Sequence, residues 1–459
     1  RAWMLLTRDS NTVSDADSFD RDEGVIGGYQ KDFFPMVDIP KDTVEENCTK
    51  GSIEEFPKDL FTAEQRRHGA VLLHTFFGLY CFILTAFICN DYLLPSLDCI
   101  CSGLNISPDV AGATFLATAN CFPELFVNVI GTFLTESDLG VGTVLGGAVF
   151  NTFATPACGA LSALHVVQLE WRILTRDCII YVISVGMLVI VMWDGLIAWY
   201  EAAMLMALFF GYLALLFSSR ALRRWYAKAT HLFYPTSKSR VRESNTIRGP
   251  DHRPFTWPKG GPLVKFWFLF TWPLKFLLFI TIPDCRLRRF QRWYFLTFVM
   301  CVVWIAISSY LTSWMMTVLG DTIGIADSIM GITFLSAGGN MPELVSIVIL
   351  SRQGNGDMAM SNTLGANTLD ILLCLGLPWT IKTFTTGKDI QIVSGTLTYS
   401  VLSIIVCVVA FYLVIAFYKF SLNKKVGAIC LLLYTIFLIF AVLIELNVFF
   451  FVNLPMCES

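Results

Sequence analysis

The sequence predicts an all-α polytopic membrane protein with about ten transmembrane helices, arranged as two inverted five-helix repeats. Hydrophobic residues fill 55% of its 459 positions and charged residues only 15%, whereas a soluble domain carries about a quarter charged residues. Apolar runs near the roughly 20 residues that cross a bilayer recur along most of the chain. A sequence pattern also returns at a constant offset of 219 positions.

Residues 1–68 are predicted to be a largely disordered extracellular or lumenal tail, because they are polar and lack periodicity. They carry 15 Asp and Glu against 9 Lys and Arg. Asn47 begins an Asn-Cys-Thr sequon, so it is a glycosylation candidate. Cys48 and Cys457 would both lie outside and are a candidate disulfide pair. The chain begins with Arg1, which is consistent with removal of a start or signal segment.

The first transmembrane repeat is predicted at 69–219 and the second at 291–452. Residues 220–290 form a basic loop, and residues 453–459 a short outer tail. The region 218–292 has 16 Lys and Arg against 3 Asp and Glu, which places it in the cytoplasm. The expected spans are 71–97, 108–133, 140–164, 175–194 and 196–218, then 291–317, 327–350, 359–380, 392–418 and 426–452.

Within the basic loop, the segment 262–282 is also apolar. It contains Trp267, Trp272, Pro273 and Lys275. Trp and Lys are at home at the membrane surface, so we expect a helix that lies in the inner interface. Counting it as a span would instead make the two repeats parallel.

The repeat is explicit in the strings GATFLATANCFPEL (112–125) and GITFLSAGGNMPEL (331–344). The same offset aligns Asp138 with Asp357 and Gly146 with Gly365. Such a register indicates duplication of one unit. Five spans per unit require the second copy to be inverted, which is typical of secondary transporters. A duplicated bundle without transport is the alternative.

Glu124 and Glu343 each follow a proline in the middle of a predicted span. An ionisable group at that depth costs at least about 2.5 kcal/mol on insertion scales, so the matched pair needs a shared reason. Pro123 and Pro342 break helix hydrogen bonds, and a broken helix exposes carbonyl oxygens to a cavity. Carboxylates and carbonyls are the ligands that Ca²⁺ prefers.

Asp370 is a third predicted buried carboxylate, and its repeat equivalent is the neutral Asn151. Asn367 lies one turn earlier, so the Asn367 and Asp370 side chains share a helix face. The extra charge fits an additional monovalent cation. A proton relay and a simple hydrogen bond to a neighbouring helix are the alternatives.

Neutral oxygens near these acids extend the candidate metal-ligand set. Each of them is at least as well explained by hydrogen bonds between helices. Glu445, close to a span end, is expected to face water. The sequence has no P-loop and no zinc-ligand spacing, so we expect no enzyme, no resident cofactor and no nucleic-acid partner. The neutral candidates are Asn120, Asn340, Asn151, Asn367, Thr114 and Thr333.

With these residues in view, the repeats resemble the α-repeats of the cation/Ca²⁺ exchanger superfamily. Over residues 48–228 and 284–450 the chain most resembles the potassium-dependent sodium/calcium exchangers. The resemblance implies that Glu124 and Glu343 form the Ca²⁺ site and that Asp370 is the potassium-linked acid. The strings that carry it are IEEFPKDLFT (53–62), DVAGATF (109–115), DLGVGTVLGGAVFN (138–151), SIMGITFL (328–335) and GDMAMSNTLGANTLDILLCLGLPW (356–379).

The chain departs from this family at four positions where serine hydroxyls usually help to coordinate sodium. The usual Gly-Ser-Ser-Ala-Pro-Glu is here ANCFPE (119–124), and Gly-Thr-Ser-Ile-Pro-Asp is GGNMPE (338–343). Ca²⁺ binding is therefore expected to be better preserved than Na⁺ binding. The four positions hold Cys121, Gly147, Asn340 and Ala366.

Together these features predict an antiporter that exchanges Ca²⁺, with K⁺, for Na⁺ by alternating access. Its partners would be the lipid bilayer and the transported cations, and its location the plasma membrane rather than an organelle. Two alternatives stay open. One is a Ca²⁺ or other cation antiporter coupled to H⁺ or Li⁺ with weakened Na⁺ coupling, and the other is a degenerate membrane protein that does not transport.

Overall fold

The computed structural model is mostly helical, and it describes the chain with several gaps. The described residues are 52–103, 117–135, 137–163, 165–231, 257, 260–285, 293–352, 354, 356–392, 396–446 and 448. Asn47, Cys48, Cys457 and Thr114 lie outside these residues, so what is said of them above remains a prediction.

The first repeat contains helices α1 to α10, and short π-helical turns join several of them. The helices are α1 Ala63–Gln65, α2 Val71–Phe87, α3 Leu94–Gly103, α5 Ala117–Asn120, α6 Phe122–Phe133, α7 Leu139–Val149, α8 Thr155–Ser162, α9 Trp171–Val191 and α10 Trp199–His231. The π-helical turns are η3 Arg66–Ala70, η4 Ile88–Leu93 and η6 Phe150–Ala154. A 3₁₀ turn, η2 Ser52–Glu55, precedes them.

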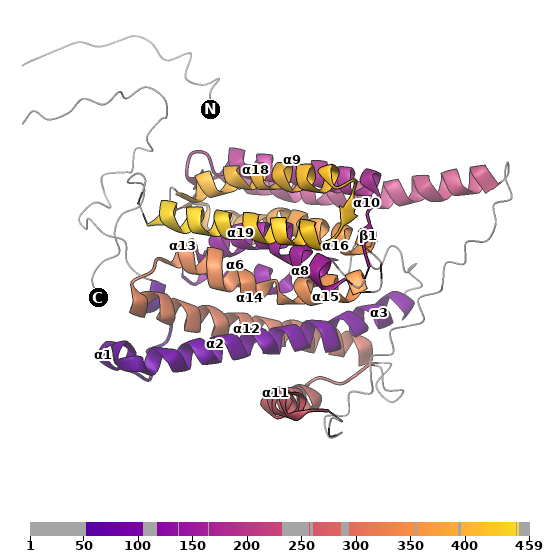
Figure 1. Ribbon diagram of the computed structural model, residues 1–459. Helices are drawn as coiled ribbons and strands as arrows, with labels where there is room; N and C mark the ends of the chain where they lie inside the picture. Colours follow the sequence, from indigo (N-terminus) through magenta and orange to yellow (C-terminus); the bar gives the residue numbers. More distant parts are fainter. Residues whose placement is uncertain are drawn as a thin grey trace, which may run out of the picture. The chain divides into compact units, whose positions relative to one another are not determined.

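The second half begins with α11 and repeats the pattern. Its helices are α11 Pro262–Thr281, α12 Tyr294–Ile323, α13 Asp327–Met330, α14 Ser336–Gly339, α15 Met341–Arg352, α16 Gly356–Leu369, α17 Gly376–Thr386, α18 Thr396–Phe417 and α19 Lys424–Glu445. The π-helical turns are η8 Gly331–Leu335 and η9 Asp370–Leu375. Figure 1 shows how these helices lie side by side.

Nine helical stretches of the described chain are long and apolar enough to cross a membrane, and the bent stretch Asp327–Arg352 would make ten. Eight of the nine, together with the bent stretch, correspond to predicted spans, and the ninth is Pro262–Thr281, which was predicted to lie in the interface. The predicted span 108–133 is described only from residue 117, and its α6 is a shorter apolar helix. The all-α polytopic fold class is confirmed.

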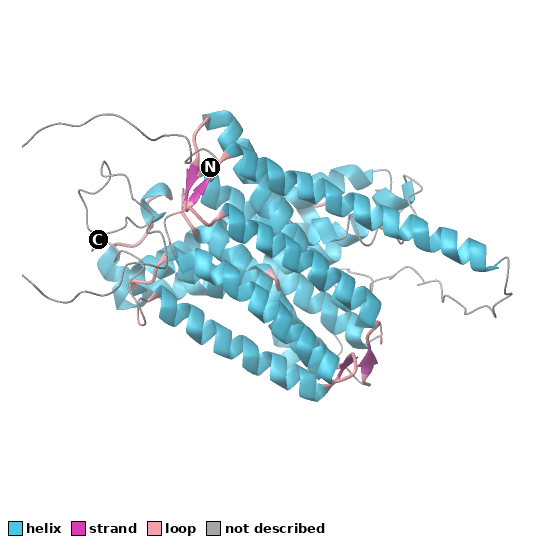
Figure 2. Cartoon of the chain, turned by 90° about the horizontal axis from the view of Figure 1, so that it is seen from above, coloured by secondary structure: helices cyan, strands magenta, loops and turns pink. Residues whose placement is uncertain are grey.

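Two short strand pairs show that the repeats are inverted. β1 (Val167–Gln168) pairs with β4 (Ser421–Leu422), and β2 (Leu196–Ile197) pairs with β3 (Ile390–Gln391). β1 and β3 occupy equivalent places, since each follows the third span of its repeat, yet they lie in different pairs. The single helix α9 separates β1 from β2, and the two pairs lie at opposite ends of the bundle (Figure 2). Equivalent loops therefore face opposite sides.

The centre of the bundle is formed by the repeat-bearing stretches. In Leu139–Ser162 and Ala359–Thr386, 89% and 78% of the most apolar window is buried, against 17% in Lys424–Glu445. Glycines allow these helices to approach closely. A Cβ at Gly146 of α7 would lie 2.3 Å from the carbonyl oxygen of Ile332 in η8.

The buried apolar side chains form two large clusters. The largest is built from α7 to α10 and α16 to α19, and it contains Tyr181 and Trp379. A second cluster joins α2, η4, α3, α11 and α12, with Ile88 and Leu278 at its centre. A smaller third cluster, which contains Phe82, Leu139 and Met316, joins α2 and α12 to α7, α13 and η8.

Residues 52–62 form an N-terminal arm that contacts the helices, which differs from the disordered tail predicted for 1–68. The Phe56 ring lies 5.7 Å from the Tyr310 ring of α12. Just after the arm, the Arg66 guanidinium forms an ion pair of 3.2 Å with Asp321. These partners on α12 fix a segment that has no hydrophobic periodicity of its own.

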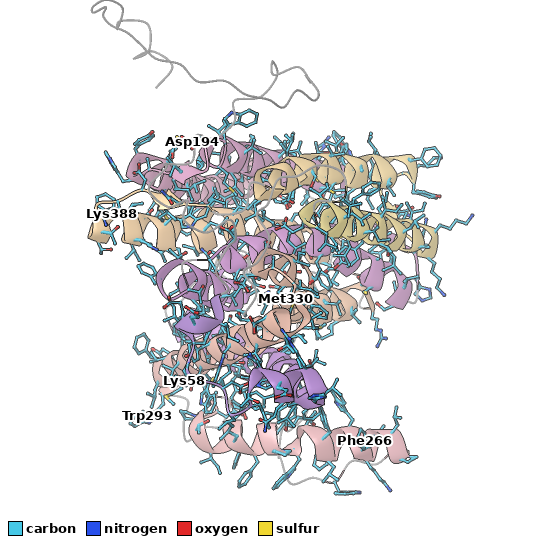
Figure 3. All side chains as sticks on the ribbon, turned by 90° about the vertical axis from the view of Figure 1, so that its left-hand side faces the viewer. Lys58, Asp194, Phe266, Trp293, Met330 and Lys388 are labelled. Atoms are coloured by element: carbon cyan, nitrogen blue, oxygen red, sulfur yellow. The ribbon has the colours of Figure 1, made fainter. Side chains whose placement is uncertain are left out.

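α11 runs crosswise to α2 and α12. Figure 1 views it along its axis, and Figure 3 shows it lying along one edge of the bundle with Phe266 on it. The Tyr80 hydroxyl donates to the Phe270 carbonyl at 3.2 Å, which attaches α11 to α2. Its length and apolarity alone would let it span. The crosswise direction supports the predicted interfacial position.

Candidate functional site

Two helix breaks at equivalent positions build the site. α5 and α6 are separated at Cys121, and α14 and α15 at Asn340, exactly one repeat offset apart; the second break bends the stretch by 43°. Pro123 lies in the first turn of α6, where its missing N–H is no loss. Glu124 and Glu343 also fall in first turns, where the helix dipole favours a negative charge.

The structure brings the three predicted carboxylates together in the buried centre. The residues Glu124, Glu343 and Asp370 are 2%, 2% and 3% exposed. Glu124 interacts electrostatically with both Glu343 and Asp370, and Glu343 interacts with Asp370. Glu124 reaches across to the other repeat, since a Cβ placed at Gly339 would lie 2.9 Å from its Oε1.

Several oxygens around these acids are buried and have no hydrogen-bond partner within the described part of the chain. They are both carboxylate oxygens of Glu124, Oε2 of Glu343, and Oδ1 of Asn120 and Asn367. A buried acceptor without a partner costs about 1–3 kcal/mol, and more if it is charged. Such groups are rare in native proteins and call for an explanation. Cations bound by these oxygens would supply one.

Asp370 and its neutral equivalent Asn151 both lie in π-helical turns, in η9 and η6. A π-helical turn inserts one residue into a helix and is frequent at functional sites. The Asp370 Oδ1 accepts a hydrogen bond from the Cys374 thiol at 3.7 Å. The equivalent residues therefore have the same backbone setting but different charge, as the sequence pairing predicts.

Asn151 and Asn340 are bonded to each other across the two repeats. The Asn151 side-chain amide donates to the Asn340 Oδ1, and Asn340 donates to the Ser336 carbonyl at 2.7 Å. The Asn151 Oδ1 itself accepts from Thr155 at 3.0 Å. An amide oxygen has a second lone pair, so both remain possible ligands, although their first bond is within the protein.

Asn367 donates to the Ala148 carbonyl at 3.2 Å, which leaves its own oxygen free of described partners. The Thr333 hydroxyl donates to the Ile329 carbonyl one turn earlier and is half-buried. Glu445, which we expected to face water, is 5% exposed and accepts a hydrogen bond from Ser328. That expectation was wrong because α13 packs against the end of α19.

The four altered serine positions lie in two equivalent pairs. The Cys121 thiol donates to the Ala366 carbonyl at 3.7 Å. In the related pair, a Cβ at Gly147 would lie 2.6 Å from the Asn340 Nδ2. The larger Asn340 side chain therefore occupies the space that a side chain at 147 would take.

Two residues near the acids escaped the sequence reasoning. Cys374 lies four residues after Asp370, and this spacing places both side chains on one helix face. The spacing was therefore a signal in the sequence that could have identified Cys374 as a site residue. Tyr181 of α9 is fully buried and interacts electrostatically with Asp370. No local pattern in the sequence distinguishes Tyr181 from other buried tyrosines.

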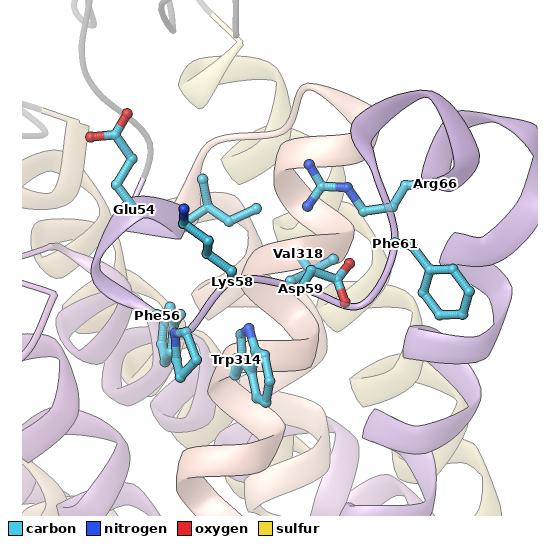
Figure 4. Close-up of a pocket in the computed structure, with 10 residues that line it drawn as sticks. Glu54, Phe56, Lys58, Asp59, Phe61, Arg66, Trp314 and Val318 are labelled. Carbon is cyan, nitrogen blue, oxygen red and sulfur yellow. The ribbon is translucent and has the colours of Figure 1, made fainter.

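A separate pocket of about 370 Å³ lies between the N-terminal arm and α12 (Figure 4). Lys58, Asp59 and Arg66 line it together with Trp314. Its described lining includes none of the three central carboxylates, so it is distinct from the site built on the repeats.

Known protein families and relatives match the regions that contain the two repeats. A family model described as sodium/calcium exchanger protein matches residues 74–218 and 293–443. Sodium/potassium/calcium exchanger 4 of Homo sapiens is 34% identical, over 92% of this chain and 89% of that protein. Sodium/potassium/calcium exchanger 3 of Homo sapiens is 33% identical, over 90% and 86%. A solved structure of the sodium-calcium exchanger NCX_Mj is 18% identical, over 80% and 97%, with a TM-score of 0.46.

Proposed function

Because the chain belongs to the sodium/calcium exchanger family, we propose that it is a secondary-active antiporter that exchanges Ca²⁺, together with K⁺, for Na⁺. The observation that carries the proposal is the meeting of Glu124, Glu343 and Asp370 in the buried centre, with oxygens that lack described partners. The names of the relatives, which are sodium/potassium/calcium exchangers, support the choice of ions.

Charge balance assigns the roles. Three ionised carboxylates carry three negative charges, which one Ca²⁺ and one K⁺ neutralise. Glu124 and Glu343 would bind Ca²⁺ with the free amide oxygens of Asn120 and Asn367, because Ca²⁺ takes six to eight oxygen ligands. Asp370 would bind K⁺. The Asn151, Asn340, Thr114 and Thr333 oxygens are further candidates.

Alternating access follows from the inverted repeats. The two broken helices carry Glu124 and Glu343, and their equivalent ends face opposite sides of the membrane. If the repeats exchange conformations, a site between them opens first to one side and then to the other. Na⁺ binding to the same acids would displace Ca²⁺ and K⁺, so the loads compete.

We place the protein in the plasma membrane, with residues 1–68 and 453–459 outside and the basic loop 220–290 inside. The excess of Lys and Arg in that loop supports this orientation. On this topology Asn47 is available for glycosylation and the Cys48–Cys457 pair faces an oxidising side. Glycosidase digestion of protein from cells tests the glycosylation of Asn47, and non-reducing peptide mapping tests the Cys48–Cys457 disulfide.

The decisive experiment measures Ca²⁺ flux in proteoliposomes while Na⁺, K⁺, Li⁺ and pH gradients are imposed separately. We expect flux that requires an opposing Na⁺ gradient and K⁺ on the Ca²⁺ side. Flux that follows the pH or Li⁺ gradient and ignores Na⁺ would replace Na⁺ with that counter-ion. Ca²⁺ binding without flux under any gradient would contradict transport itself.

A further inference from the structure

Two thiols and a carboxylate converge beside the proposed ion site. Cys121, at the first helix break, and Cys374 and Asp370, in η9, place one ligand atom each within 4.8 Å of the other two, and all three residues are buried. Two of these residues come from the second repeat and one from the first. The cluster forms only where the repeats meet.

The spacing matches the coordination sphere of a small divalent metal. Zinc binds thiolate sulfur at about 2.3 Å and carboxylate oxygen at about 2.0–2.2 Å, in tetrahedral geometry. Two such ligands of one ion then lie roughly 3.6 Å apart. The Cys374 Sγ and the Asp370 Oδ1 are 3.7 Å apart, so these two atoms need hardly move.

The thiols form long hydrogen bonds to nearby carbonyls. The Cys121 Sγ donates to the Ala366 carbonyl at 3.7 Å, and the Cys374 Sγ donates to the Cys121 carbonyl at 3.3 Å. A metal that displaces both thiol protons breaks these bonds, as well as the bond from Cys374 to the Asp370 Oδ1 at 3.7 Å, and replaces them with metal–ligand bonds. Both sulfurs also interact electrostatically with Glu124, whose oxygens lack described partners. The negative charge of Glu124 near both sulfurs also favours a bound cation.

The geometry points to a binding site for a thiophilic divalent cation, Zn²⁺ or Cd²⁺, formed by Cys121, Cys374 and Asp370. Soft thiolate ligands select such metals, whereas Ca²⁺ takes oxygen ligands. Binding occupies Asp370 and places a positive charge near Glu124, so the metal inhibits transport in competition with K⁺ and Ca²⁺. The inhibition rests on the proposed function, but the metal site itself does not.

X-ray absorption at the zinc edge, on the purified full chain kept reduced, tests the site without any transport. We expect two sulfur ligands per zinc in the wild type and one in Cys374→Ser. We expect zinc affinity to fall at least tenfold in that variant, since even outer partners of a metal site account for about 10–100-fold. Cys430→Ser is the matched control, because Cys430 is a buried cysteine in α19 that lies outside the cluster.

Only oxygen or nitrogen ligands around zinc in the wild type would overturn the site. Two sulfur ligands that persist in the double variant Cys121→Ser with Cys374→Ser would overturn it as well. A flux arm separates the two proposals. If zinc is bound by sulfur in a chain that shows no Ca²⁺ flux, the metal site stands and the antiporter function is rejected. If Ca²⁺ flux is normal but zinc has no sulfur ligands, the antiporter function stands and the metal site is rejected.

Discussion

Gly339 is the position at which one methyl group should disturb the ion site without unfolding the protein. A Cβ there would lie 2.9 Å from the Glu124 Oε1, whereas ordinary contacts begin at 3.4 Å. The carboxylate must retreat by about 0.5 Å, which exceeds the roughly 0.3 Å range of Ca²⁺–oxygen bond lengths. The displaced atom is the end of a flexible side chain, so the helices themselves need not move.

We therefore expect Gly339→Ala to weaken Ca²⁺ binding while the protein still folds. Steric insertions of this kind cost about 1–3 kcal/mol, and each 1.4 kcal/mol is tenfold in affinity. Ca²⁺ affinity should fall by about 5- to 150-fold. Titration calorimetry on purified protein measures the affinity, and the thermal unfolding temperature reports folding.

Two further variants sharpen this test. Gly186→Ala in α9 is the control, because a Cβ there meets nothing within 4 Å, and it should leave Ca²⁺ affinity unchanged. Adding Glu124→Asp to Gly339→Ala shortens the acid by one methylene and should recover part of the affinity. If Gly339→Ala binds Ca²⁺ as tightly as the wild type, the Glu124 carboxylate does not bind Ca²⁺ in the position described.

Further predictions concern the other site residues. Glu124→Gln and Glu343→Gln should each abolish Ca²⁺ flux in cells with normal surface protein, since losing one member of a buried charge pair costs about 3–5 kcal/mol; undiminished flux in either would exclude that acid from the site. Asp370→Asn should relax the K⁺ requirement of Ca²⁺ flux, and an unchanged K⁺ dependence would reject its role. Gly147→Ser alone should lower transport, because the Asn340 amide fills the space of the added side chain. Adding Asn340→Ser should restore transport and lower the Na⁺ concentration that gives half-maximal flux. If transport does not recover in the double variant, the two side chains do not share that space.

The sequence was sufficient to predict the two repeats and the buried carboxylates Glu124 and Glu343. A fixed offset of 219 placed Glu124 opposite Glu343, and an odd number of spans per copy required inversion, which the strand pairing bears out. The hydrophobic pattern could do this because it records which stretches cross the membrane, and duplication preserves their order.

Contacts between side chains that are distant in the sequence could not be predicted from it. The Asn151–Asn340 bond joins residues 189 positions apart, and only the helix crossing brings them together. Glu445 looked like a solvent-exposed residue at the end of a span, but Ser328 lies against it. The cluster of Cys121 with Cys374 was missed because the two residues are 253 positions apart in the sequence, and only the packing of the two repeats brings them together.

The two strand pairs also restrict which parts of the molecule can slide. Each pair fastens a loop of one repeat to a loop of the other, one at each membrane face. The helices that carry these loops share the largest apolar core, whereas α2 and α12 pack in the second core and in the smaller third cluster. Because strand pairs connect them at both ends of the bundle, the helices that carry these loops are expected to stay fixed relative to one another. The helices α2 and α12 are then expected to be the part that shifts against them.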